Sequence, residues 1–242
     1  DATKAKLEYK AGSCSGSWSD PTLDESGGAT ADTNDSGGTP SVVNADAYQI
    51  GTTATRRIVT TSGSNTVQFD WTSATDESSA DGSYCLRITV NDDGGDQTTP
   101  GTTTLTLDNV SPTGLTALTT TPATTSMVLT WDAVTETNFN HYEIWYGETQ
   151  ADVQNRTGTA TEWDNTDDSD LATRTTAATT ITGLTPNTRY YFKIWAIDDY
   201  GNVVPFDEET GYGCWVQARL TAGAVVASAD ADIAVHIVGK FW

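Results

Sequence analysis

The sequence predicts an all-β protein that consists of two tandem β-sandwiches and an extended C-terminal strand. Three observations support this fold class: short segments alternate apolar with polar residues, stretches rich in Gly, Asp, Asn and Ser separate them, and no long stretch shows helical spacing. A length of 242 residues suits two domains of ordinary size. We therefore expect domains at residues 1–110 and 111–222, followed at 223–242 by a linker and a further strand.

The first domain carries four motifs that define its expected strands and turns. They are KLEYKAGS at 6–13, TVQFDWTSATD at 66–76, ADGSYCLRITVND at 80–92 and LTLDNVSPT at 105–113. Together they resemble the immunoglobulin-like repeats of large bacterial surface proteins, which implies a β-sandwich. Repeats of this kind begin with a strand before the position of Leu7, where this chain has only a few residues. The resemblance therefore implies that the domain lacks its first strand.

The second domain carries a more specific set of motifs. They are SPTGLTAL at 111–118, SMVLTWDAV at 126–134, HYEIWYG at 141–147, ITGLTPNTRYYFKIWAID at 181–198 and GCWVQARL at 213–220. This series resembles a fibronectin type III domain, with Trp131 as the core tryptophan. The resemblance puts Leu184, Pro186, Thr188 and Tyr190 at the tyrosine corner, where the phenol ties a loop to the sheet. The long segment 147–180 departs from compact members of the family.

The last twelve residues, 231–242, alternate strongly between two faces of an extended chain. One face consists of Ile233, Val235, Ile237, Gly239 and Phe241. Burying each large apolar side chain contributes about 1.5–3 kcal/mol, and each hydrogen bond to a groove adds about 1 kcal/mol. Ordering each of the twelve residues costs about 1–2 kcal/mol in backbone entropy. This near balance predicts a strand that does not fold alone but locks into a preformed groove. It either joins the sheet of another subunit, pairs with its own chain, or begins a further domain.

An aromatic patch is expected on the outer face of the second domain. If Tyr190 and its alternate neighbours face the core, then Tyr191 and Trp195 face outward. If Ile144 and its alternate neighbours also face the core, Trp145 faces outward on a neighbouring strand. A large exposed patch of this kind marks a subunit interface or a platform on which carbohydrate stacks. Alternatively, the segment 147–180 folds over these aromatic residues and buries them.

The chain is strongly acidic, with 12 Lys+Arg against 33 Asp+Glu and a formal charge of −21. This charge argues against nucleic acid and anionic lipid as partners. Calcium is a candidate ligand of Asp164, Asp168 and Asp170, because oxygen-bearing side chains stand at alternate positions from Asp164 through Thr166 to Asp170. A second candidate calcium site is Asp92, Asp93 and Asp96 together with Asp108 and Asn109. The alternative for both is an acidic turn in contact with solvent.

The three cysteines are Cys14, Cys85 and Cys214. A disulfide between Cys14 and Cys85 is expected inside the first domain, which leaves Cys214 free or bonded to another subunit; three reduced thiols are the alternative. The composition favours an extracellular protein at a cell surface, where a disulfide persists. No apolar stretch approaches the roughly 20 residues that a membrane helix needs, so no membrane insertion is expected.

The sequence predicts a structural or binding role rather than catalysis. His141 and His236 have no nucleophile or metalloprotease motif beside them. We expect a subunit of an extracellular filament whose partners are copies of itself, joined head to tail by donation of the C-terminal strand. The alternatives are an adhesin or carbohydrate-binding module that engages glycans, and an accessory region of a secreted hydrolase.

Overall fold

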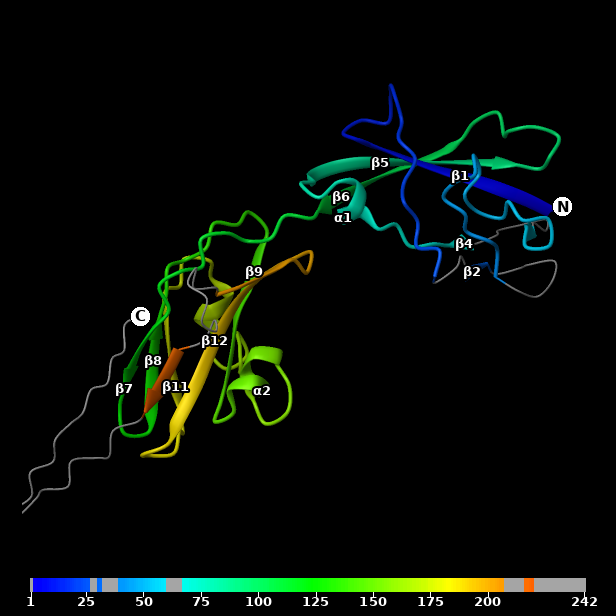
Figure 1. Ribbon diagram of the computed structural model, residues 1–242. Helices are drawn as coiled ribbons and strands as arrows, with labels where there is room; N and C mark the ends of the chain where they lie inside the picture. The colour runs from blue at the N-terminus through cyan, green and yellow to red at the C-terminus, as the bar shows by residue number, and fades with distance from the viewer. Residues whose placement is uncertain (1, 27–29, 32–38, 60–66, 207–215, 220–242) are drawn as a thin grey trace, which may run out of the picture. The chain divides into compact units, whose positions relative to one another are not determined.

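The computed structural model describes residues 2–26, 30–31, 39–59, 67–206 and 216–219 of the chain. The chain divides into two compact units, Asp1–Val110 and Ser111–Trp242 (Figure 1). In the described residues, regular structure is almost entirely β, apart from two short α-helices and one 3-10 helix. The all-β fold class is therefore confirmed.

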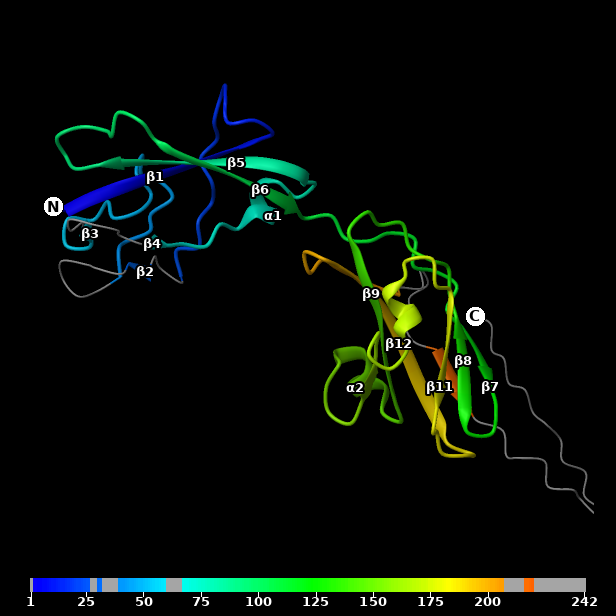
Figure 2. The same ribbon diagram turned by 180° about the vertical axis from the view of Figure 1, so that it is seen from behind.

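A four-stranded antiparallel sheet in the order β3-β1-β5-β6 forms the frame of the first unit. Strands β1, β5 and β6 run side by side in both views (Figures 1 and 2). A small second sheet pairs β2 with β4, and the short helix α1 follows β4. The elements are β1 (Ala2–Ala11), β2 (Thr30–Ala31), β3 (Ile58–Val59), β4 (Val67–Gln68), α1 (Ser73–Asp76), β5 (Asp81–Asn91) and β6 (Gly101–Asp108).

Alternation along β1 determines which of its residues enter the core of the first unit. Ala5, Leu7 and Tyr9 are buried, as a period of two residues requires. The disulfide between Cys14 and Cys85 confirms the expected pairing, with 5.3 Å between the two Cα atoms. It ties the loop after β1 to the middle of β5, so two segments 71 residues apart are covalently joined.

The open edge of the first unit's main sheet can be assigned from the pairing of the described strands. Strand β1 already begins at Ala2, and one of its edges pairs with β5 from Lys4 to Ala11. Its other edge pairs with β3, and isolated bridges join Ala5 to Ile50 and Tyr9 to Ser19. Both edges of β1 therefore have neighbours, so a strand before Leu7 has no free position beside β1. The unpaired edge belongs to β6, for which β5 is the sole partner among the described strands.

The second unit contains two antiparallel sheets that face each other across one core. The first has the order β10-β9-β12-β13, with β14 also paired to β12, and the second has the order β11-β8-β7. Short helices follow β9 and β10. The elements are β7 (Thr119–Pro122), β8 (Ser126–Thr130), β9 (Phe139–Gly147), α2 (Gln150–Asn155), β10 (Thr161–Trp163), η1 (Ser169–Ala172), β11 (Ala178–Thr182), β12 (Arg189–Asp198), β13 (Val203–Pro205) and β14 (Val216–Arg219).

The core of the second unit contains the residues that the sequence assigns to it. Trp131 is buried between the sheets, and Phe192 and Ile194 of β12 are fully buried with it. The backbone N–H of Thr185 donates to the Tyr190 hydroxyl over 3.2 Å. This contact is the expected tyrosine corner, and it fixes the loop that enters β12.

The segment 147–180 is part of this unit rather than an appendage to it. It forms α2, β10 and η1, and β10 extends the sheet beside β9. Leu171 of η1 is fully buried in the main core, and Val153 of α2 is fully buried as well. These two side chains anchor the segment against the sheet.

Candidate functional site

The feature of the first unit that most resembles a binding site is an apolar cavity of about 280 Å³ on the inner face of its sheet. Strands β1, β5 and β6 supply most of its walls. Its lining residues are Leu7, Phe69, Leu86, Ile88, Gly101, Thr102 and Thr103. The cavity is apolar because β1 and β5 point their leucine and isoleucine side chains into it, while Gly101 adds no side chain beside Ile88.

The apolar face around this cavity is incompletely covered. Leu86, Ile88 and Val90 point inward from the central strand β5, yet all three are only half-buried. The corresponding central strand of the second unit, β12, buries Phe192 and Ile194 completely. Among the described residues of the first unit, the inner apolar face of β5 is therefore only partly covered.

Strand β6 forms the rim of the cavity and is the edge of the sheet. Residues Gly101–Thr104 are exposed, and no charged side chain occurs between Gly101 and Leu107. Natural edge strands are usually kept short or protected by charges, because unpaired N–H and C=O groups template further pairing. At eight residues, β6 is the longest edge strand in the described part of the chain.

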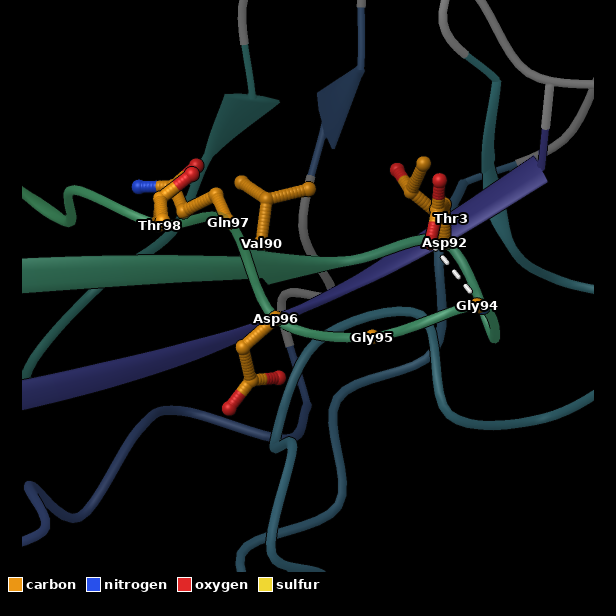
Figure 3. Close-up of a pocket in the computed structure, with 8 residues that line it drawn as sticks. All are labelled: Thr3, Val90, Asp92, Gly94, Gly95, Asp96, Gln97 and Thr98. Carbon is orange, nitrogen blue, oxygen red and sulfur yellow. Dashed lines mark hydrogen bonds between the residues drawn. The ribbon is translucent and has the colours of Figure 1, made fainter.

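A second cavity, of about 570 Å³, lies at the turn between β5 and β6 and is polar (Figure 3). Its lining residues are Thr3, Val90, Asp92, Gly94, Gly95, Asp96, Gln97 and Thr98. Asp92 accepts a hydrogen bond from the N–H of Gly94 over 2.9 Å, and Asp96 points away from Val90 and Gln97 (Figure 3). These contacts define an acidic turn built largely by its own hydrogen bonds.

The carboxylates of this turn already have partners. Asp93 forms ion pairs with Lys4 at 2.7 Å and Arg57 at 3.1 Å, and the hydrogen bond from Lys4 lowers the pKa of Asp93. Asp96 accepts from the Tyr48 hydroxyl, which lowers the pKa of Asp96. The positive charges of Lys4 and Arg57 therefore oppose the binding of a cation here.

The second candidate calcium site does not assemble in one place. The register pairs Ile88 with Gly101 and Asp81 with Asp108, so Asp108 lies at the opposite end of β6 from the turn at 92–96. Seven residues of strand span about 24 Å. Asn109 uses its side-chain amide to donate to the Glu77 carbonyl over 2.8 Å. The prediction that Asp92, Asp93, Asp96, Asp108 and Asn109 form one site is wrong for this reason.

The other acidic loop is also shaped by internal hydrogen bonds. Asp164 accepts from both the N–H and the hydroxyl of Thr166 over 2.7 Å, and the hydroxyl contact lowers the pKa of Asp164. Asp168 accepts from the Asp170 N–H at the start of η1 and from the Thr179 hydroxyl over 2.6 Å. Calcium binding at Asp164, Asp168 and Asp170 stays a prediction, and the turn has a structural explanation without it.

The expected aromatic patch is not exposed. Trp195 is only 5% exposed, and Trp145 and Tyr191 are half-buried. The Arg156 guanidinium at the end of α2 lies over the Trp195 ring, 5.2 Å from its centroid, and also contacts Glu143 at 3.3 Å. The prediction of an exposed platform is wrong for Trp195, because the segment 147–180 covers it, as the alternative anticipates.

Two expectations are not tested by this geometry. The donor-strand residues Ile233, Val235, Ile237, Gly239 and Phe241, and also Cys214, lie outside the described residues.

Within either unit taken alone, the described residues do not place three His, Cys, Asp or Glu ligand atoms within 4.8 Å of one another. The described helices are also too short or too polar to cross a membrane.

The apolar cavity beside β6 is the site that the sequence alone does not reveal. The sequence GTTTLTLD at 101–108 contains one indication of an unprotected edge strand. It has a strand pattern, and no charged residue precedes Asp108. That string does not show that β6 is an edge, because strand order depends on contacts between distant segments.

Comparison with known proteins identifies part of the chain. A family model described as Fibronectin type III domain matches residues 110–211, whereas no curated protein matches the chain. The chicken CNTN1 FN1–FN3 domains are similar at 13% identity and a TM-score of 0.49, over 91% of this chain and 57% of that one.

Two further solved structures are similar to parts of the chain. Chitinase ChiA74 from Bacillus thuringiensis shares 24% identity at a TM-score of 0.33, over 48% of this chain and 15% of that one. The fn3 domain of human contactin 1 shares 16% identity at a TM-score of 0.36, over 50% of this chain and 84% of that one. The chain thus spans 57% and 15% of the first two structures that it matches. The family match, together with the buried Trp131 and the tyrosine corner of Tyr190, shows that this chain contains a fibronectin type III domain, at residues 110–211.

Proposed function

We propose that this protein is the structural subunit of an extracellular filament at a cell surface, assembled head to tail by strand donation. In this proposal the segment 231–242 of one copy enters the sheet of the first unit of the next copy. The observation that supports it is the half-covered apolar face of the first unit beside an unpaired sheet edge. The disulfide and the fibronectin type III domain suit an extracellular or secreted protein.

Strand donation accounts for two features that are otherwise costly. Incompletely buried leucine and isoleucine side chains forgo hydrophobic stabilisation of about 25 cal/mol per Å² left in water. An open edge also exposes the protein to uncontrolled pairing. A donated strand removes both costs, and a contact between two different surfaces of the same protein extends into a fibre when its rotation does not close a ring.

The charge of the chain is compatible with a joint at this position. Two copies that each carry −21 repel one another. The donor segment itself contains one Asp and one Lys, Asp232 and Lys240, and is therefore formally neutral with its histidine uncharged. Because β6 carries no charge before Asp108, neither side of the joint adds strongly to the repulsion. Assembly is expected to strengthen as ionic strength rises, since salt screens the charge on the rest of the surface.

The proposal is tested with two charge substitutions on opposite faces of the donor segment. Ile237→Asp puts a carboxylate on the face expected to enter the neighbouring subunit, and burying an unpaired charge is strongly unfavourable. Val238→Asp adds the same charge to the opposite face. Sedimentation velocity is expected to show polymers for the wild type and for Val238→Asp, and monomers for Ile237→Asp. Polymers of equal size from all three proteins would refute strand donation through this face.

A second candidate function is a binding or spacing module within a longer surface protein. The match of residues 110–211 to a fibronectin type III domain favours it, because such domains commonly occur as modules. Glycan binding through the predicted platform is disfavoured by the burial of Trp195. An immunoblot of the source cells separates the two candidates: a band far longer than 242 residues favours the module, and a ladder of polymers favours the filament.

A further inference from the structure

We propose that the acceptor for the donated strand is the outer edge of β6 in the first unit, with the apolar face of the donor lying in the cavity beside Gly101–Thr103. The inference rests on the proposed function, and it specifies which edge is used and which side chains meet. The resemblance implies a missing strand before Leu7 without saying which sheet edge it would occupy, and both edges of β1 already have neighbours.

The chemistry of the cavity favours an apolar donor strand at this edge. Its walls are apolar side chains from three segments, and Thr102 and Thr103 form the side nearest the open edge. Cross-strand partners share a face of a sheet, so the pairing of Thr103 with Leu86 points Thr103 inward. A side chain entering from a strand beside β6 would meet Leu7, Leu86 and Ile88.

The volume of the cavity also suits the side chains of the segment 231–242. An engineered cavity of about 150 Å³ is large enough to bind benzene, so about 280 Å³ has room for two aliphatic side chains. The donor segment presents Ile233, Val235 and Ile237 at alternate positions of one face. Consecutive members of this set are about 6.8 Å apart along a strand. Two neighbouring members can therefore enter the same cavity from a strand beside β6.

Strand β6 differs from other sheet edges in the described part of the chain by its length and by the cavity beside it. The edge strand β3 has two residues, β10 and β13 have three each, and β7 has four and ends in Pro122. Strand β11 has five residues, and its inward-facing Thr179 and Ile181 are already buried. Only β6 combines a length of eight residues with an adjoining apolar cavity. A donor segment of twelve residues is long enough to cover it.

The occupant is the same chain's C-terminal segment from a second copy. Its alternation places five apolar or glycine residues on one face, which complements an apolar cavity beside an edge. Its other face, which includes Ala234, His236 and Val238, would then lie on the same side of the enlarged sheet as Thr102, Thr104 and Thr106.

The experiment joins the two strands by cysteine crosslinking between different full-length chains, each with Cys214→Ser. One chain carries Thr106→Cys on β6, and the other carries a single cysteine at 234, 236 or 238. Directly opposed residues on one face have Cβ atoms about 4.5–5.5 Å apart, so mild oxidation is expected to give a heterodimer with one or two of these positions. Ile237→Cys is the control in the donor segment. Its side chain is expected to face the cavity, so it is expected to give no heterodimer with Thr106→Cys.

A second edge supplies the control for the acceptor. Thr180 is an exposed residue on the edge strand β11 of the second unit. Thr180→Cys is expected to give no heterodimer with any donor position. Crosslinking to Thr180→Cys instead of Thr106→Cys, or to neither of them, would overturn the assignment of β6.

A pair of lysine substitutions separates failure of this inference from failure of the proposed function. Thr103→Lys places a charge at the mouth of the cavity and is expected to abolish polymers, whereas the neighbouring Thr104→Lys points to the other face and preserves them. If polymers require Ile237 but form equally with Thr103→Lys, strand donation stands and β6 is not the acceptor. If the wild-type chain forms no polymers at all, the proposed function fails and the inference fails with it.

Discussion

At the residue scale, the disulfide is the contact with the clearest energetic consequence. Cys14–Cys85 closes a loop across 71 residues of sequence. A crosslink of this span restricts the unfolded chain and typically stabilises a protein by about 2–4 kcal/mol. The double variant Cys14→Ser/Cys85→Ser is therefore expected to lower the free energy of unfolding of the first unit by that amount in urea titrations.

A reductant provides the control for this prediction. Wild-type protein with dithiothreitol is expected to unfold at the same urea concentration as the double variant, and dithiothreitol is expected to leave the double variant unchanged. A double variant as stable as the oxidised wild type would show that the bond does not constrain the chain.

Asp76 gives a second residue-scale prediction, on pH dependence. Burial opposes ionisation of this carboxyl, but hydrogen bonds from the N–H and hydroxyl of Thr22 and from Nε1 of Trp71, each 2.7 Å long, lower its pKa overall. A lowered folded-state pKa contributes stability that is complete above the unfolded value of about 4 and is lost as pH falls through the folded value.

Asp76→Asn is the variant that reveals this contribution. The wild type is expected to be more stable than Asp76→Asn at pH 6, and the difference is expected to shrink as pH falls below about 4. Urea unfolding at several pH values measures it, with Asp46→Asn as a matched change at an exposed site. A difference that is constant with pH would contradict the assigned cause.

At the element scale, the segment 147–180 acts as part of the core. Leu171 of η1 is fully buried in the main cluster of the second unit. Removing a buried leucine side chain costs about 2–5 kcal/mol, so Leu171→Ala is expected to lower the free energy of unfolding by that amount. Thr175→Ala, at an exposed position of the same segment, is expected to change it by less than about 0.5 kcal/mol. Similar small effects for both would mean that the segment is an independent loop.

Much of each element could be predicted from the sequence, because alternation reports directly on burial. The period of two in β12 correctly assigns Tyr190, Phe192 and Ile194 to the core. The same pattern fails for Trp195, which is buried from the other side by α2 and Arg156. Alternation distinguishes the two faces of a strand, but it does not report whether a distant segment covers the outer one.

The sequence also does not indicate which edge of the first unit's sheet is open. The sequence identifies a strand at Leu105 and Leu107 and a strand pattern at 231–242, and the resemblance implies a missing strand before Leu7. None of these indicates which sheet edge is open. Strand order is determined by pairing between segments far apart in the chain, such as Leu7 with Ile88. Local patterns contain no information on that order, so the edge at β6 emerges only from the structure. The resemblance of the first unit to immunoglobulin-like repeats stays a prediction.

At the scale of the whole molecule, the two units differ in how completely their described core residues are buried. The second unit has its core and tyrosine corner in place, whereas the first retains a cavity and an open edge. In the proposed polymer, the segment 231–242 would gain stability by binding a groove that is already formed, because the groove residues lose little further conformational entropy on binding. The polymer is thus expected to form without a change in the fold of either unit.

Negative-stain electron microscopy of the full-length chain beside a chain ending at Ser228 tests strand donation most directly. The account predicts filaments from the full-length protein and monodisperse particles from the shortened one. Filaments from both proteins, or single particles from both, would contradict it.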